Sequence, residues 1–439
     1  MKKLILSIMA LLTVTFSFAQ SVDEKLGAML NGGKWFELRE FLETNTDTIH
    51  PFLDMYAKAM EAHFFNRHEA AAEHCSSLLN SPQIDLANVA SVGLLMCSDI
   101  SMLGDNAAAA RTLEAINDAV KPYHEHLDST VVKAIKTDIA KYKALASYKI
   151  NDVEPFGDKA LVPFDIVAVG ADSTAQEAIN IGGRINGHGC AMTFDTGAGV
   201  NVISDSIAAA FGLDILNVDL KAGGYGVQRA RLAVAKELTV GGLTIRNVPF
   251  YVMTMLSGND EADKYMRHFQ IVIGRSVMEA VKYFTIDFAG REIVVRRELD
   301  IPPAVRPNLC ISTGGVYRLL CHTFDGTPMI VNPDTGDSSY GTLNPNMLPL
   351  AGSRQALELS PKKIRMAGAG GVLESPYYEV KDMPLTIGGV SANVPQMTLL
   401  ADGAALSSEF DGRMGLAAFM LFRSVSFDLS RMVMYPMRY

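Results

Sequence analysis

The sequence lacks the features that mark several common classes of protein. It has no block of lysine and arginine, and its 39 basic against 48 acidic side chains give a formal net charge of −9, so we expect no nucleic-acid partner. After the N-terminus no apolar run approaches the roughly 18 residues of a membrane span. There is no CxxC pair and no Cys/His cluster. These absences argue against a structural zinc site and give no reason to expect a cofactor.

The scattered histidines do not indicate a metal site. His63, His68 and His74 fall in one helical stretch, but spacings of five and six do not share one helix face. We therefore expect no metal to bind there.

The cysteines leave two possibilities open. Five remain beyond the N-terminal segment: Cys75, Cys97, Cys190, Cys310 and Cys321. Cys310 and Cys321 flank a Gly314-Gly315 turn and could face each other across a hairpin, although a disulfide needs demanding geometry. The alternative is five buried free thiols.

The first residues have the pattern of a targeting signal. Lys2 and Lys3 precede an apolar run from Leu4 to Val14, and Ser17-Phe18-Ala19 is a small-x-small cleavage site. We expect a signal peptide over residues 1–19 and a protein that is exported, either to the periplasm or out of the cell. No cysteine follows the cleavage site, so no lipid anchor is expected.

Residues 20–150 read as an α-helical domain. Apolar residues recur at three-and-four spacing on both sides of polar breaks at Asn66-Arg67-His68 and Gly104-Asp105-Asn106. Aligning Ala71 with Ala109 gives a period of 38 residues, which is that of a helical-hairpin repeat. The small-residue positions resemble those of tetratricopeptide repeats, and a plain helical bundle is the alternative.

The pattern changes after Ile150 to short β-branched runs between Gly-rich turns, which is typical of strands and hairpins. A Pro-rich break from Ile301 to Pro307 divides this region. We expect an all-β, bilobal part of the chain, with a first lobe over residues 151–300 and a second over 301–439.

The second lobe repeats the first. The segment AMTFDTGAGVNVIS carries Asp195-Thr196-Gly197, and PMIVNPDTGDSSYGTL carries Asp334-Thr335-Gly336, 139 residues later. Three further landmarks recur in the same order, with spacings of 147, 141 and 141 residues: Gly241-Gly242 and Gly388-Gly389, Gly274 and Gly415, and Asp287 and Asp428. Four landmarks at nearly constant spacing indicate an internal duplication.

With two Asp-Thr-Gly turns, residues 160–439 resemble a two-lobed aspartic protease of the pepsin and retropepsin superfamily, and more closely the bacterial retropepsin-like proteins. The resemblance implies that Asp195 and Asp334 form a catalytic dyad around one water, with no cofactor and no metal. It also implies that Thr196 and Thr335 bond across the lobe interface, while Gly197 and Gly336 turn the chain tightly.

The same resemblance assigns a substrate-covering flap to the Gly-rich segments. In the first lobe these residues are Gly224, Tyr225 and Gly226, and in the second they are Gly368, Gly370 and Gly371. Tyr225 is either a substrate contact or a surface tyrosine of the hairpin. Asp287 and Asp428 are expected to be structural residues at strand ends.

Three positions depart from the family pattern. Pro333 stands in the strand that should deliver Asp334, although proline is disfavoured in central strands. Asp337 adds a carboxylate that either points inward and raises the proton affinity of the pair or points outward and caps the turn. Gly199 stands where a hydroxyl or carboxyl side chain is usual.

The leading hypothesis is an exported aspartic endopeptidase that acts on a peptide or protein. Because one chain supplies both halves of the site, the site needs no second subunit, and the oligomeric state is left open. The helical domain would bind a protein partner, dock substrate or cover the cleft. The competing hypotheses are a protease-like protein that grips peptides without cutting them and a helical platform for interactions.

Overall fold

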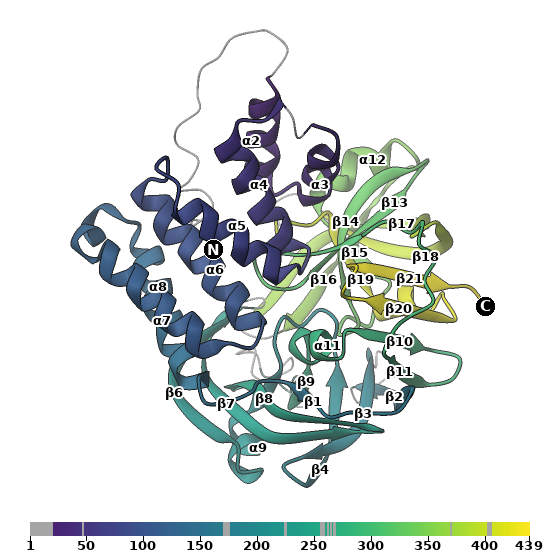
Figure 1. Ribbon diagram of the computed structural model, residues 1–439. Coiled ribbons are helices and arrows are strands. Elements are labelled where there is room, and N and C mark those ends of the chain that lie inside the picture. Colours follow the sequence, from purple (N-terminus) through teal and green to yellow (C-terminus); the bar gives the residue numbers. More distant parts are fainter. Residues whose placement is uncertain are drawn as a thin grey trace. The chain divides into compact units, whose positions relative to one another are not determined.

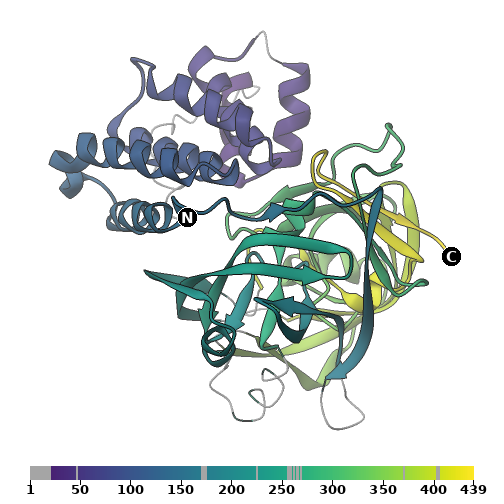
Figure 2. The same ribbon diagram turned by 60° about the horizontal axis from the view of Figure 1, so that its bottom comes forward.

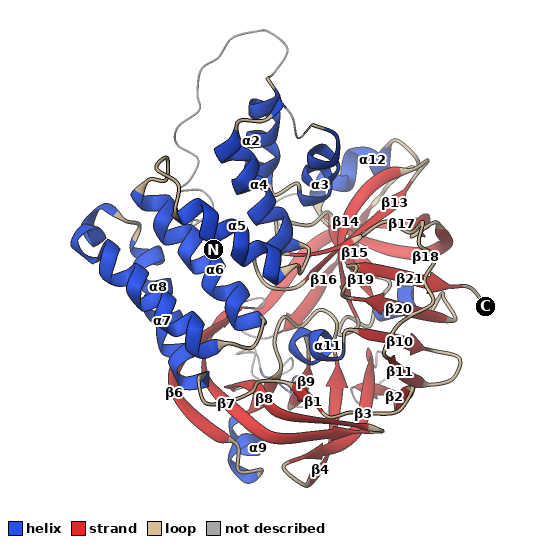
Figure 3. Cartoon of the chain, viewed as in Figure 1, coloured by secondary structure: helices blue, strands red, loops and turns tan. Residues whose placement is uncertain are grey.

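The computed structural model describes residues 21–45, 48–169, 176–223, 226–254, 260, 263, 266, 269–368, 371–401 and 406–439. The chain divides into two compact units, residues 1–150 and 151–439. The first is helical and the second is built from strands, as the colours of Figure 3 show. The predicted order of a helical part followed by an all-β part is therefore confirmed.

The helical unit is a succession of helices joined by short turns (Figure 1). They are α2 (Val22–Gly32), α3 (Trp35–Thr44), α4 (Pro51–Phe64), α5 (His68–Leu79), α6 (Leu86–Met102), α7 (Asn106–Val120), the 3₁₀ turn η3 (Lys121–His126) and α8 (Ser129–Leu145). Several helices begin at side-chain caps. Ser21 and Glu24 form a capping box at α2, while Asp105 accepts the backbone N–H of Ala108 at the start of α7.

The 38-residue period corresponds to two consecutive helical hairpins, α4–α5 and α6–α7. Ala71 is the fourth residue of α5 and Ala109 is the fourth residue of α7, and both side chains are fully buried. A small residue is needed at this position because the second helix of each hairpin packs closely there.

The first lobe of the β unit contains eleven described strands and two short helices. They are β1 (Asp152–Val153), β2 (Lys159–Val169), β3 (Gln176–Ile185), β4 (His188–Phe194), β5 (Val202–Ser204), α9 (Asp205–Ala210), β6 (Asp214–Gly223), β7 (Val227–Val240), β8 (Leu243–Met253), β9 (Ile271–Ile273), α11 (Arg275–Val281), β10 (Tyr283–Asp287) and β11 (Glu292–Arg296).

The second lobe repeats this scheme. Its elements are β12 (Leu309–Ile311), β13 (Tyr317–Thr323), β14 (Thr327–Asp334), β15 (Gly341–Leu343), η4 (Pro345–Met347), α12 (Leu348–Gly352), β16 (Leu359–Gly368), β17 (Gly371–Ile387), β18 (Val390–Leu400), β19 (Gly412–Gly415), α13 (Leu416–Phe419), β20 (Ser424–Asp428) and β21 (Val433–Met437). In the turned view of Figure 2 the teal strands of the first lobe lie in front of the green and yellow strands of the second.

The two lobes share a sheet. Strands β12 to β19 form an eight-stranded sheet, whereas β20 and β21 join the thirteen-stranded sheet of the first lobe, where β20 pairs with β10 and β21 pairs with β20. In that pairing Thr285 lies opposite Ser426, its equivalent 141 residues later, and their hydroxyls are 2.8 Å apart. The two copies of the duplication thus meet at equivalent residues.

All five cysteines are free, so the possible Cys310–Cys321 bridge is not formed. The reason is the strand register, because Cys310 lies opposite Arg318 and Cys321 lies opposite Met329. The alternative, five buried free thiols, holds for four of them, whereas Cys190 is partly exposed.

Across the described residues, no helix combines the length and the apolar character that a bilayer crossing requires.

Candidate active site

Two equivalent turns carry the aspartates predicted to form the site. Asp195 follows β4 directly, and Asp334 is the last residue of β14. Each carboxylate accepts the backbone N–H two residues further along, from Gly197 at 2.8 Å and from Gly336 at 2.9 Å. Asp334 is buried, while Asp195 is partly exposed.

A reciprocal set of hydrogen bonds locks the two turns together. The Thr196 hydroxyl donates to the carbonyl of Pro333 at 2.8 Å and accepts the backbone N–H of Thr335 at 3.0 Å. The Thr335 hydroxyl donates to the carbonyl of Phe194 at 3.0 Å and accepts the backbone N–H of Thr196 at 3.0 Å. Both threonines are fully buried, so these bonds are shielded from water.

Glycine is required at the third position of both turns because each turn touches the opposite carboxylate. A Cβ atom added to Gly197 would lie 2.7 Å from Oδ2 of Asp334, and one added to Gly336 would lie 2.6 Å from Oδ2 of Asp195. The two carboxyl groups are themselves hydrogen-bonded to each other. This packing brings together Asp195, Thr196, Gly197, Asp334, Thr335 and Gly336, the six residues that the repeated motif singles out.

Pro333 does not interrupt β14, in contrast to the disturbance that its position suggested. Pairing of β14 with β13 ends at Val331, so Pro333 faces no ladder partner on that side. On the other side it pairs with Met414 of β19 in a parallel register. The hydrogen bond between the two turns uses the carbonyl oxygen of Pro333 and not a backbone N–H, which proline lacks.

Arg413 is a component of the site that the sequence did not predict. It lies in β19, where its Nε is 3.2 Å from Oδ2 of Asp334 and its Nη1 is 3.6 Å from Oδ2 of Asp337. The equivalent residue of the first lobe, 141 positions earlier, is the buried apolar residue Val272. The signal that could have revealed Arg413 is a charged residue one position before Met414-Gly415, in a strand that is apolar in the first copy.

Asp337 has both of the orientations considered from sequence. One carboxylate oxygen caps the turn by accepting the backbone N–H and the hydroxyl of Ser339, at 2.9 and 2.7 Å. The other oxygen faces Arg413. Gly199, the third departure from the pattern, lies so close to the second lobe that an added Cβ atom would be 2.9 Å from the carbonyl oxygen of Gly315.

The surroundings of the two carboxyl groups differ. Burial raises the pKa of Asp195 well above its ordinary value, and the neighbouring charge of Asp334 raises it further. Burial also raises the pKa of Asp334, but the guanidinium of Arg413 opposes this effect. The arrangement favours a pair of carboxyl groups that together hold one proton, with Arg413 beside Asp334.

The described residues of the Gly-rich segments predicted as flaps lie at the ends of two strand pairs. Gly223 pairs with Val227 at the end of β6–β7, and Gly368 pairs with Gly371 at the end of β16–β17. Gly226 lies in the first tip, whereas Gly224, Tyr225 and Gly370 lie outside the described residues. Val227 is 70% exposed, which leaves an apolar side chain open to solvent at the first tip.

Asp287 and Asp428 have the structural role expected of them. Asp287 ends β10 and accepts the backbone N–H of Gly290 at 2.9 Å. Asp428 ends β20 and accepts the backbone N–H groups of Ser430 and Arg431, at 3.1 and 2.9 Å.

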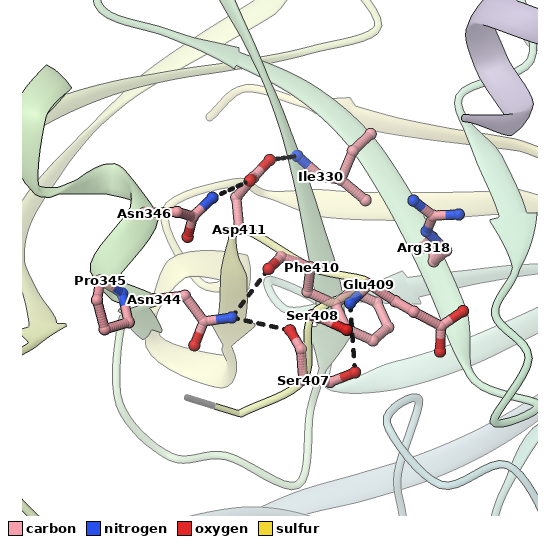
Figure 4. Close-up of a pocket in the computed structure, with 10 residues that line it drawn as sticks. All are labelled: Arg318, Ile330, Asn344, Pro345, Asn346, Ser407, Ser408, Glu409, Phe410 and Asp411. Atoms are coloured by element: carbon pink, nitrogen blue, oxygen red, sulfur yellow. Dashed lines mark hydrogen bonds between the residues drawn. The ribbon is translucent and has the colours of Figure 1, made fainter. Parts of the chain in front are cut away.

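A separate pocket of about 510 Å³ lies in the second lobe, where the chain approaches β19 (Figure 4). Its polar groups bond to one another. Asp411 accepts the backbone N–H of Ile330 at 2.8 Å and the amide of Asn346 at 2.6 Å, and Asn344 donates to the carbonyls of Ser407 and Phe410. This network anchors the residues just before Arg413 to β14, so it supports the position of the guanidinium.

One family of known proteins matches part of the first lobe. Residues 181–277 match a family described as aspartyl protease. Among solved structures, the chain is similar to the crystal structure of a retropepsin-like aspartic protease from Rickettsia conorii, with 18% identity over 33% of this chain and 90% of that chain, and a TM-score of 0.21. The comparison with curated proteins finds no match. The family match covers the first Asp-Thr-Gly turn and confirms the resemblance to an aspartyl protease over residues 181–277.

Proposed function

We propose that this protein is an aspartic endopeptidase whose dyad is Asp195 and Asp334. The observation that carries the proposal is the reciprocal bonding of Thr196 and Thr335, which holds two equivalent turns with their carboxyl groups in contact. Two carboxyl groups that share one proton supply both the base and the acid that peptide hydrolysis by water requires.

The charge distribution assigns each carboxyl group a role in this proposal. Asp334 is ionised beside Arg413 and takes a proton from the attacking water, whose oxygen bonds to the carbonyl carbon of the peptide. Asp195 gives its proton to the carbonyl oxygen, which leaves a tetrahedral diol. Asp334 then protonates the amide nitrogen as the C–N bond breaks and Asp195 recovers a proton from the diol, so the pair again holds one proton.

The remaining parts of the proposal concern the other segments of the chain. Residues 1–19 would be removed as a signal peptide, and the mature enzyme would act in the periplasm or outside the cell. The β6–β7 hairpin would cover the bound peptide and exclude water from it. The helical unit would serve as a docking region for substrate or for a protein partner, or as a cover for the cleft.

A second function is favoured by one observation, the ion pair between Arg413 and Asp334. A carboxylate held by a guanidinium is a weaker base, so the same cleft could bind a peptide without cutting it. The alternatives differ in whether the bound peptide is recovered intact.

The test is to incubate the full-length protein with a peptide library between pH 3 and pH 8 and to analyse both bound and released peptides by mass spectrometry. The proposal predicts new peptide termini that disappear when a statine-type transition-state mimic is added. Peptides that co-purify with the protein and remain uncut at every pH would instead establish the binding function.

A further inference from the structure

Two histidines that are separated in sequence meet at one buried carboxylate in the helical unit. His63 lies in the last turn of α4, His68 is the first residue of α5, and Asp99 lies in the last turn of α6. The chain reverses between the two helices at Asn66, whose φ of 60° is left-handed. The reversal, and not a shared helix face, brings the two imidazole rings together.

The contacts converge on Asp99. The Nδ1 atom of His63 lies 3.0 Å from one carboxylate oxygen of Asp99 and 3.1 Å from the other, and Nδ1 of His68 lies 2.6 Å from the first oxygen. In the part of the chain that the structure describes, this is the one group of three or more histidine, cysteine or acidic side chains whose ligand atoms all lie within 4.8 Å of one another.

The carboxylate of Asp99 is buried between the two histidines. The Asp99 side chain is 0% exposed, and its ion-pair partners among the described residues are the two histidines alone. A buried carboxylate is strongly disfavoured unless it is paired.

We propose that His63, His68 and Asp99 bind a divalent transition metal ion of the zinc type. Two imidazole nitrogens and one carboxylate oxygen suit zinc, cobalt or nickel, whereas magnesium and calcium prefer oxygen ligands alone. Metal–ligand bonds of about 2.0–2.1 Å place neighbouring ligands of a tetrahedral ion roughly 3.3 Å apart. The observed distances of 2.6–3.1 Å from the imidazole nitrogens to the Asp99 carboxylate would widen to admit the ion, and all three ligand atoms lie within 4.8 Å of one another.

The ion would act as a clasp within the helical unit. Its three ligands come from α4, α5 and α6, which are consecutive helices of the two hairpins. Binding to the folded arrangement alone would stabilise that arrangement against unfolding. This site is independent of the proposed peptidase, because none of its ligands belongs to the β unit.

The test uses full-length protein without a histidine tag, stripped of metal with a chelator and titrated with Zn²⁺ by calorimetry and with Co²⁺ by visible absorption. We expect one ion per chain and a rise in the temperature at which the helices melt. His63→Gln and His68→Gln should each weaken binding roughly a hundredfold. His74→Gln is the matched control and should bind like the wild type, since His74 lies on α5 but outside the group.

Two results would overturn the proposal. One is wild-type protein that shows no saturable site for either ion and melts at the same temperature with and without the chelator. The other is a saturable site whose affinity is the same in His63→Gln, His68→Gln and His74→Gln. If one variant fails to fold, the other histidine variant and the reversibility of the wild-type melting shift still decide the question.

Discussion

The guanidinium of Arg413 lies 3.2 Å from the carboxylate of Asp334, whereas the matching residue of the first lobe is Val272, whose side chain carries no charge. The two aspartates therefore occupy equivalent positions in the sequence and in the backbone, but they differ in the charged side chains around them. A duplicated site has thus become asymmetric through a residue that lies outside the duplicated motif.

Replacing Arg413 with methionine should move the pH profile of activity to higher pH. The active form of the pair holds one proton, so activity falls at low pH when a second proton binds and at high pH when the last one leaves. A nearby cation favours the charged forms and lowers both transitions, so its removal raises both, by about one pH unit or more. The measurement is kcat/KM against pH for one cleaved peptide.

Two further variants control for damage to the fold. Arg413→Lys retains the charge and should keep most of the wild-type profile. Asp337→Asn removes a negative charge that raises the pKa of Asp334, so its profile should move to lower pH. Equal shifts in the same direction for Arg413→Met and Asp337→Asn would refute the electrostatic explanation.

Replacing Thr196 with valine should lower both stability and activity. The change keeps the shape but leaves the carbonyl of Pro333 and the N–H of Thr335 without their bonds in a buried place. Each such loss costs about 1–3 kcal/mol. Urea denaturation measures the change. Thr342→Val is the control, because among the described residues the buried Thr342 hydroxyl makes one hydrogen bond, a long one of 3.8 Å to the sulfur of Met366. An equal loss of unfolding free energy in both variants would show that the hydrogen bonds between the two turns contribute no more than an ordinary buried hydroxyl.

Adding a methyl group at Gly197 or Gly336 should abolish activity. In either variant the new Cβ atom would lie against the opposite carboxylate and push the pair apart. Gly182→Ala is the matched control in β3, because nothing lies within 4 Å of the Cβ atom it would add. We expect at least a hundredfold loss of kcat/KM in the first two variants and none in the control. An active Gly197→Ala enzyme would mean that the turns do not hold the carboxyl groups in contact.

Replacing Asp195 with asparagine should stabilise the protein increasingly as the pH rises. The pKa of Asp195 in the folded chain is raised, so its contribution to stability is complete below the ordinary carboxyl pKa of about 3.9 and is lost as the pH rises through the folded value. Asparagine does not titrate, so the variant does not lose this contribution to stability as the pH rises. Melting temperatures at pH 4 and pH 7 test this. A difference in melting temperature between wild type and variant that is the same at pH 4 and at pH 7 would contradict this prediction.

The sequence allowed the duplication and the paired turns to be predicted because both depend on short motifs at a repeated spacing. Asp-Thr-Gly occurs twice, and Gly241 and Gly388, with φ values of 52° and 55°, mark the same turn in each lobe. Positive φ angles select glycine strongly, so these positions can be read directly from the sequence.

Other features could not be predicted because they depend on contacts between distant strands or helices. Arg413 reaches Asp334 only because β19 pairs with β14. Asp99 lies more than 30 residues from the two histidines it contacts, and no spacing rule connects them. The effect of Pro333 was misjudged because the sequence does not show that β13 stops pairing two residues earlier.

The central claim, that Asp195 and Asp334 together hydrolyse a peptide bond, is tested most directly by kcat/KM of the full-length protein for one cleaved peptide. The comparison includes Asp195→Asn and Asp334→Asn, with Asp287→Asn and Asp428→Asn as controls from the same duplicated landmarks. We predict a loss of about a thousandfold in each of the first two variants and less than about tenfold in each control. Cleavage that survives Asp334→Asn at the wild-type rate would contradict the account.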